Sequence, residues 1–280
     1  MDLQTRPAVQ PGMGLSTLPV VQPGPMTEMD RFMFECYGYI VIEDVLNPDE
    51  VQETLEAAKR VHAGKITGKL HQIGKAFEQE PALERLIDHP AFLPKVRALY
   101  KDRFVLQAAW CTVQPANSQS VGWHQDGSGA YEFRELGYPT PLLQLRVSFN
   151  LTDQSELYMG NMMMIPGSHR SSMVLPKAVR GQVEACPIQQ IICAKPGSVL
   201  IFHNGVYHSP MPNNRDFDRY NMHYIYSPPW LRRSDRDATD PEFLERTTPV
   251  RRAMMGDYDR PDRPFGGGYP AIPFEARDEE

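Results

Sequence analysis

The chain has 280 residues, of which 41% are hydrophobic and 23% charged, and its formal net charge is -6. This is the composition of a folded globular protein with room for one large domain and a substantial core. The negative charge argues against a broad basic surface for nucleic acid, and no apolar stretch approaches the roughly 20 residues that a membrane span needs.

The cysteines indicate a reducing compartment. Cys36, Cys111, Cys186 and Cys193 show no CxxC spacing and are too few for a disulfide scaffold in a chain of this length. We interpret them as reduced packing residues, with a zinc site as the minor alternative. Because the N-terminus also lacks a basic segment leading into a hydrophobic one, we expect a cytoplasmic protein.

The first 100 residues are predicted to contain a leader and flanking helices. Residues 1–26 are rich in proline and glycine, which predicts a flexible leader. A short helix, a turn at Gly38 and a strand over 39–46 are expected next. Asn47 as N-cap, Pro48 at the first position and Gly64 at the far end predict a strong helix. A second helical stretch, 81–101, is interrupted by prolines.

From residue 103 to 226 the sequence becomes strand-like. Short β-branched and aromatic runs alternate with Gly, Pro, Asn and Asp turns: RFVLQAAWCTVQ, LLQLRVSFNLTD, GNMMMIPGSH, CPIQQIICAKPGSVLIFHN and DRYNMHYIYSPP. Helices followed by strands predict a mainly β fold, a sandwich or jelly roll with N-terminal flanking helices, over 27–230. Residues 231–280 are predicted to form an extended tail packing on the core or on a neighbouring subunit.

The segment GWHQDGSGAY places two metal-ligand types close together. In an extended chain the side chains of i and i+2 share one face, so His124 and Asp126 can point at one spot. A third ligand is expected from the segment after the PGS turn, where His208 and His203 compete. Two histidines and one carboxylate are typical of non-haem Fe(II) oxygenases. A polar turn without metal is the alternative.

Arg219 adds an anion anchor to this pattern. A planar guanidinium on a strand can grip a carboxylate through two parallel hydrogen bonds, which suits an anionic co-substrate. A plain surface ion pair is the alternative for Arg219.

With these residues the chain resembles the phytanoyl-CoA dioxygenase family of Fe(II)- and 2-oxoglutarate-dependent oxygenases, which includes the ectoine hydroxylases. The resemblance rests on WHQDG, on GNMMMIPGSHR followed by KPGS, and on His208 lying eleven residues before Arg219, and it covers roughly residues 30–230. It implies a double-stranded β-helix, a jelly roll of the cupin type. In this chain YMGN replaces the acid-Asn-Gly that usually precedes PGSH.

The resemblance also implies roles for individual residues. His124, Asp126 and His208 would bind iron, Arg219 would hold the far carboxylate of 2-oxoglutarate, and Gln107 would line the co-substrate or substrate pocket. Ser209 and Asn221 would add hydrogen bonds to the co-substrate. O2 would be the second co-substrate, and the reaction would oxidise an unactivated C–H bond of a small molecule while 2-oxoglutarate is decarboxylated to succinate.

Three residues are candidates for the substrate pocket. Tyr131 and Trp123 are expected at its mouth, although aromatic residues are more often core. Arg146 is an unusual charge in an alternating strand. Facing the barrel interior it would bind an anionic substrate, whereas facing outward it would pair with an acid.

Other functions remain open at this point. A cupin-type metalloenzyme would not use 2-oxoglutarate, an acyl-CoA 2-hydroxylase would share the chemistry, and a binding module would hold a ligand without reaction. A nucleic-acid demethylase would need a second arginine where the chain has Ile225. The protein is expected to be a monomer or a homodimer with a small-molecule substrate and no nucleic-acid or membrane partner.

Overall fold

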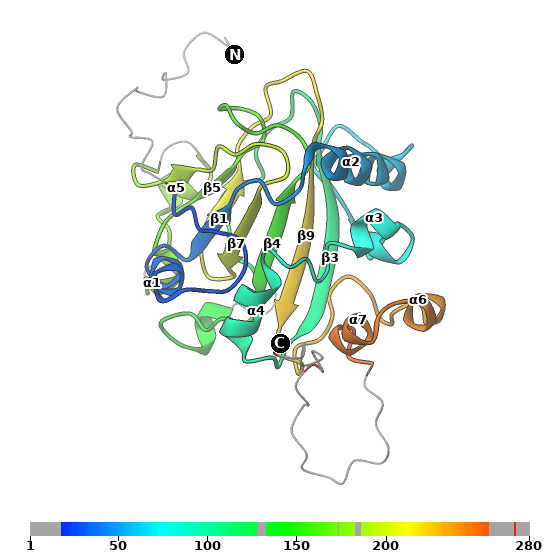
Figure 1. Ribbon diagram of the computed structural model, residues 1–280. Coiled ribbons are helices and arrows are strands. Elements are labelled where there is room, and N and C mark those ends of the chain that lie inside the picture. The colour runs from blue at the N-terminus through cyan, green and yellow to red at the C-terminus, as the bar shows by residue number, and fades with distance from the viewer. Residues whose placement is uncertain (1–17, 128–132, 173, 183–185, 258–271, 273–280) are drawn as a thin grey trace.

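The computed structural model describes residues 18–127, 133–172, 174–182, 186–257 and 272. Among these residues no helix is long and apolar enough to cross a membrane. The centre of the molecule is a large antiparallel sheet, with helices gathered beside it (Figure 1).

Six strands form this sheet in the order β1-β7-β4-β9-β3-β2. Their bounds are β1 Tyr39–Ile42, β2 His71–Gly74, β3 Val105–Gln114, β4 Leu145–Asn150, β7 Val199–His203 and β9 Arg219–Ser227. Strands distant in sequence therefore lie side by side, as β4 lies between β7 and β9. This order brings residues from segments that are far apart in the sequence onto one interior surface.

A smaller sheet lies opposite, with the order β6-β5-β8. It consists of β5 Met162–Met164, β6 Gln190–Ile191 and β8 His208–Pro210. The HxD segment joins its edge, because His124 and His208 exchange two backbone hydrogen bonds of 3.1 and 2.9 Å. The arrangement is the double-stranded β-helix predicted from the sequence.

Side chains of β4 and β9 alternate between the two faces of the large sheet. On β9 the outer residues Tyr220, Met222, Tyr224 and Tyr226 belong to the main hydrophobic core, together with Leu145, Val147 and Phe149 of β4. The residues between them face the opposite side, into the barrel, because successive side chains of a strand point to opposite faces. The barrel interior is therefore lined by polar residues such as Arg146, Ser148, Arg219, Asn221 and His223.

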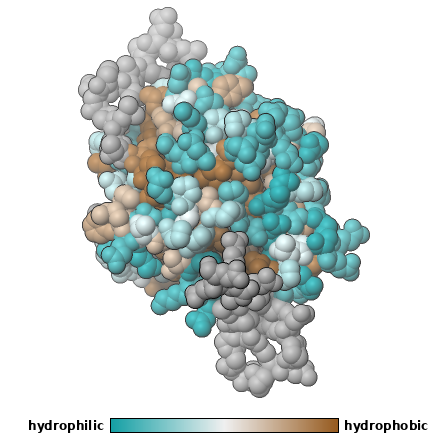
Figure 2. All heavy atoms as spheres, in the orientation of Figure 1, coloured by the Kyte–Doolittle hydropathy of each residue, from teal (hydrophilic) through white to brown (hydrophobic). Residues whose placement is uncertain are grey.

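The helices, except the short one between β5 and β6, cover the apolar face of the large sheet. They are α1 Glu28–Tyr37, α2 Pro48–His62, α3 Pro81–Glu84, α4 Leu93–Tyr100, α5 Lys177–Arg180, α6 Pro241–Arg246 and α7 Pro249–Met254, with short 3-10 turns at 76–78, 133–136 and 168–170. In the orientation of Figure 1 their outward surface is mostly hydrophilic, with hydrophobic side chains visible in the gaps (Figure 2).

The predicted start of α2 is confirmed in detail. The Asn47 side chain accepts hydrogen bonds from the backbone of Asp49 and Glu50, the Glu50 carboxylate accepts from the Asn47 backbone, and Pro48 occupies the first helical turn. The predicted turn after α1 is also present, with Gly38 left-handed at φ 81°. In the second helical stretch Pro90 separates two helices, whereas Pro94 lies in the first turn of α4, where proline is well tolerated.

The described residues of the leader and of the tail differ in part from the predicted segments. The end of the expected leader packs on the sheet, because the backbone N–H of Val21 donates to Val41 and the Val21 side chain is buried. The expected extended tail contains α6 and α7, and buries Phe243 and Met254 against the core. In both places a few apolar side chains pack on the edge or face of the large sheet. These contacts join segments that are far apart in the sequence, so the composition of each segment alone does not predict them.

Candidate active site

Three side chains that are far apart in the sequence meet at the mouth of the barrel. His124, Asp126 and His208 each offer one ligand atom, and these atoms lie within 4.8 Å of one another. Histidine, cysteine, aspartate and glutamate are the usual metal ligands. Among the described residues, this is the group of three such side chains whose ligand atoms lie close enough together to hold one metal ion. His208 Nε2 lies 3.8 Å from Asp126 Oδ1, and both side chains are almost fully buried.

The donor atoms of this group suit a divalent transition metal. His208 Nε2 and Asp126 Oδ2 are buried without a hydrogen-bond partner among the described residues. The other ring nitrogens face backbone carbonyls, with His208 Nδ1 2.9 Å from Val206 O and His124 Nδ1 3.2 Å from Gly122 O. A ring held by Nδ1–H in this way leaves the Nε2 lone pair for a metal.

Burial and charge favour the ligating protonation states of His208 and Asp126. Burial, together with the charges of its neighbours, lowers the pKa of His208 to about 3, so the ring is neutral. Burial alone raises the pKa of Asp126, but the positive charge of Arg146 is the largest opposing effect, and the net shift is downward. Two imidazoles and one carboxylate are the donor set of a two-histidine, one-carboxylate iron site.

Arg146 faces the barrel and pairs with an acid there. Its Nη2 donates to Asp126 Oδ1 at 2.7 Å, and both side chains are largely buried. The sequence allows two orientations for Arg146. Facing the interior it would bind an anionic substrate, and facing outward it would pair with an acid. The structure combines the interior position with an ion pair, because the acid is itself one of the three clustered side chains.

Arg219 is a buried cation without an acidic partner among the described residues. Its side chain is 1% exposed, and its Nη2 donates to the neutral Oε1 of Gln114 at 2.7 Å. The Nε of Arg219 is buried without a partner, and burial lowers its pKa to about 10. A guanidinium desolvated in this way favours an anionic ligand, because a carboxylate restores the interactions that burial removes.

The remaining predicted co-substrate residues contact protein groups. Ser209 Oγ lies 2.9 Å from Ser120 Oγ, and the Asn221 amide oxygen accepts from Gln154 Nε2 at 2.9 Å. The Gln107 amide donates to Arg232 O at 2.7 Å in the C-terminal segment. Their contact with a co-substrate stays a prediction.

The predicted aromatic residues differ in what the structure describes. Trp123 is 4% exposed and packs in a hydrophobic cluster with Met163, Ile165 and Tyr207, on the face of the HxD segment opposite to His124. Tyr131 lies outside the described residues. His203, the competing candidate ligand, does not belong to the group of three clustered side chains. Its Nδ1 accepts the Gly205 N–H at 2.9 Å.

Comparison with known proteins agrees with this geometry. The family model described as phytanoyl-CoA dioxygenase matches residues 34–220, which is more than half of the chain. The chain belongs to the phytanoyl-CoA dioxygenase family. It is accordingly an Fe(II)- and 2-oxoglutarate-dependent oxygenase with the double-stranded β-helix fold.

Relatives of this family member include enzymes with known structures. An ectoine dioxygenase of Sphingopyxis alaskensis is 21% identical over 72% of this chain and 76% of its own. HygX of Streptomyces hygroscopicus, solved with nickel and 2-oxoglutarate, superposes with a TM-score of 0.65 at 16% identity over 78% of this chain and 94% of its own. The carbocyclase SnoK from nogalamycin biosynthesis gives 0.58 at 21% identity over 74% and 87%.

Two interior residues of this family member were missed by sequence reasoning. Gln114, at the end of β3, pairs in register with Arg219 and orients it. His223, which was not among the predicted site residues, faces the interior with its Nδ1 buried and without a partner among the described residues. Burial lowers the pKa of His223 well below its usual value, as do the nearby charges of Arg146 and Arg219. Strand alternation from Arg219 would have placed His223 on the same face.

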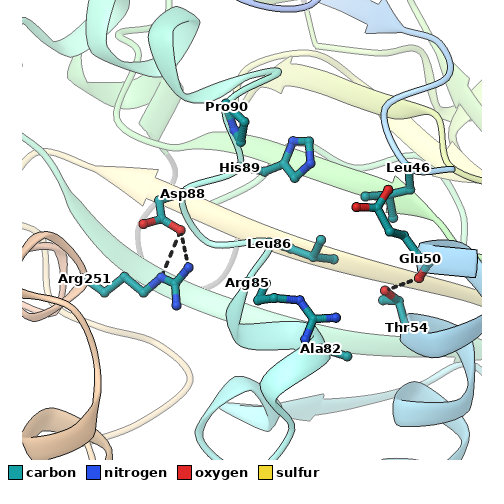
Figure 3. Close-up of a pocket in the computed structure, with 10 residues that line it drawn as sticks. All are labelled: Leu46, Glu50, Thr54, Ala82, Arg85, Leu86, Asp88, His89, Pro90 and Arg251. Carbon is teal, nitrogen blue, oxygen red and sulfur yellow. Dashed lines mark hydrogen bonds and ion pairs between the residues drawn. The ribbon is translucent and has the colours of Figure 1, made fainter. Parts of the chain in front are cut away.

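A separate pocket lies on the helical side of the protein and shares no residue with the group of His124, Asp126 and His208. It is lined by residues of α2, of the segment around α3 and of α7 (Figure 3). Its charges are paired locally, since Arg251 binds Asp88 at 2.7 Å and the Glu50 carboxylate accepts from the Asn47 backbone N–H at 2.9 Å. This pocket holds no cluster of titratable groups suited to the oxygenase reaction.

Proposed function

We propose that His124, Asp126 and His208 bind Fe(II), and that Arg219 binds the far carboxylate of 2-oxoglutarate. The observation that carries the proposal is the convergence of their ligand atoms within 4.8 Å, two of them buried without a partner. A buried polar atom without a partner is costly in a folded protein, and a bound metal would remove that cost.

The reaction proposed is oxidation of an unactivated C–H bond in a small metabolite or natural product. Bound Fe(II) supplies activation of O2, coupled to decarboxylation of 2-oxoglutarate to succinate. The chain holds the co-substrate through Arg219 and keeps the His208 ring neutral by burying it. The names of SnoK and the ectoine dioxygenase support a substrate of this class.

A spectroscopic titration tests the metal and co-substrate sites together. Anaerobic protein with Fe(II) and 2-oxoglutarate is expected to give a weak visible charge-transfer band. His124→Ala and Asp126→Ala should each lose the band and all 2-oxoglutarate decarboxylation. A folded, metal-loaded protein without the band, or decarboxylation retained in both variants, contradicts the proposal.

Arg219→Met separates this function from a cupin-type enzyme that uses no 2-oxoglutarate. We expect the variant to bind Fe(II) as the wild type does and to lose affinity for 2-oxoglutarate by about 10- to 100-fold, because a charge-assisted hydrogen-bond pair is lost. Activity indifferent to both 2-oxoglutarate and this substitution would favour the cupin-type enzyme.

We also propose that the enzyme works in the cytoplasm on a small molecule, as a monomer or a homodimer. The free thiols of Cys36, Cys111, Cys186 and Cys193 support a reducing compartment. Size-exclusion chromatography with light scattering distinguishes the two oligomeric states.

A further inference from the structure

The two oxygens of the Asp126 carboxylate have different surroundings. Oδ1 accepts a hydrogen bond from Arg146 Nη2 at 2.7 Å. Oδ2 is buried and has no hydrogen-bond partner among the described residues. Oδ1 also lies 3.8 Å from His208 Nε2, so Oδ2 is the oxygen of this carboxylate that no described side chain or backbone group contacts by a hydrogen bond.

Arg146 is held firmly in this position. Strand alternation on β4 turns it inward, because Leu145 and Val147 on either side belong to the outer core. Its guanidinium packs over the Phe202 ring at 5.5 Å from the ring centroid. The same ring lies edge-on to His208 at 4.8 Å. Arg146, Phe202 and two of the three clustered side chains thus form one packed unit.

A carboxylate can bind a metal through one oxygen or through two. An arginine that occupies one oxygen with a charge-assisted hydrogen bond leaves the other for the metal and reduces the negative charge available to it. An oxygenase of this class needs open coordination positions beside its three protein ligands. A carboxylate that bound through both oxygens would fill one of those positions.

We propose that Arg146 is a positioning residue that keeps Asp126 a one-oxygen metal ligand and so preserves an open coordination position. The inference rests on the proposed metal-binding role of Asp126. It assigns to Arg146 a function in arranging the metal site rather than in binding substrate. Its consequences appear in metal binding itself, before any turnover.

The test uses the full-length protein loaded with Mn(II), whose exchangeable water ligands accelerate water-proton relaxation. In Arg146→Met the freed oxygen joins the coordination sphere, so the number of exchangeable waters should fall by about one. Mn(II) should bind about tenfold more tightly, because the carboxylate regains its full charge and a neighbouring cation is gone. Arg146→Lys keeps the charge and one donor, and is expected to restore the wild-type water count.

A matched control removes an arginine elsewhere. Arg232→Met deletes an exposed partner of Asp237, so it changes the net charge equally, and metal binding should stay as in the wild type. Circular dichroism verifies that each variant is folded. If Arg146→Met does not fold, Arg146→Lys carries the test.

The outcomes separate the two claims. A wild-type protein that binds no Mn(II) overturns the proposed function and this inference with it. A metal-binding wild type whose Arg146→Met variant shows the same water count, with unchanged or weaker affinity, overturns the inference alone. A lower water count in Arg146→Lys equal to that in Arg146→Met also overturns it, since charge and hydrogen bond would then be irrelevant.

Discussion

At the scale of single residues, the proposed binding of an anion by Arg219 depends on the buried pair that Arg219 forms with Gln114. A neutral amide orients the guanidinium through a 2.7 Å hydrogen bond and leaves its charge uncompensated. An acid at the same place would satisfy the cation permanently and compete with any incoming carboxylate. The choice of glutamine over glutamate therefore keeps Arg219 available.

Substitution of Gln114 tests this. Gln114→Glu, which has the same shape, should raise the KM for 2-oxoglutarate by about 100-fold, because a buried carboxylate on Arg219 competes with the co-substrate. Gln114→Met should raise it by only about tenfold, since orientation is lost without competition. Steady-state kinetics with varied 2-oxoglutarate measures both, and equal effects of the two variants would contradict the competition argument.

The residue scale also shows what a single sequence can reveal. The HxD pair and the distal histidine and arginine were predicted as ligands, and the structure brings all four into the barrel. The inward position of Arg146 and of His223 follows from strict alternation along β4 and β9, so it was available in principle. The hydrogen bond from Arg219 to Gln114 was not, because it depends on the register between two strands a hundred residues apart.

At the scale of elements, the turn before β5 approaches the anion anchor very closely. Gly160 is left-handed at φ 71°, and a Cβ there would lie 2.7 Å from Gln114 Oε1 and 2.9 Å from Arg219 Nε. The turn thus closes the pocket around Arg219 with backbone alone. This is the segment in which YMGN departs from the usual family pattern.

Gly160→Ala is expected to weaken 2-oxoglutarate binding by about tenfold or more, because the methyl group displaces a buried charged hydrogen bond. Gly64→Ala is the matched control. Gly64 has nearly the same backbone angle, φ 70°, but nothing lies within 4 Å of its Cβ position. Both variants carry the cost of a left-handed alanine, about 1 kcal/mol. Isothermal titration should therefore show a loss of 2-oxoglutarate affinity in Gly160→Ala only, and a similar loss in both would contradict the contact argument.

Elements differ in how well the sequence predicts them. The helix α2 and the long strands β3 and β9 carry caps or sustained alternation, and their positions were predicted closely. The strands β2 and β8 were not predicted, since they span only four and three residues and depend on pairing with distant partners. The helices α6 and α7 were missed because proline was interpreted as disfavouring regular structure, whereas here it begins each helix.

At the scale of the whole molecule, stability is coupled to pH through buried histidines. Burial lowers the pKa of His203 to about 3, helped by the nearby His169 ring, and it also lowers the pKa values of His62, His89 and His169. These rings bind a proton more readily in the unfolded chain than in the folded one. The free energy of unfolding should therefore fall as the pH drops below about 6.5, the ordinary pKa of histidine.

His203→Asn isolates one contribution. The asparagine amide oxygen can accept the Gly205 N–H as Nδ1 does, but it does not titrate. Between pH 7 and pH 5 the wild type should lose up to about 2 kcal/mol more stability than the variant, for a single histidine with a pKa lowered this far. Urea unfolding at the two pH values measures the difference, and parallel losses would contradict the assignment.

The alternation of side chains on β4 and β9 has a consequence for how such an enzyme can diversify. Outward residues such as Tyr224 and Val147 hold the helices, whereas inward residues such as His223, Ser148 and Arg146 line the reaction chamber. The residues that stabilise the fold and the residues that face the proposed site thus occupy alternate positions along the same strands. A library confined to inward positions other than Arg146 and Arg219 would vary the lining of the barrel while leaving the folding core unchanged, which makes this sheet a favourable starting point for laboratory evolution.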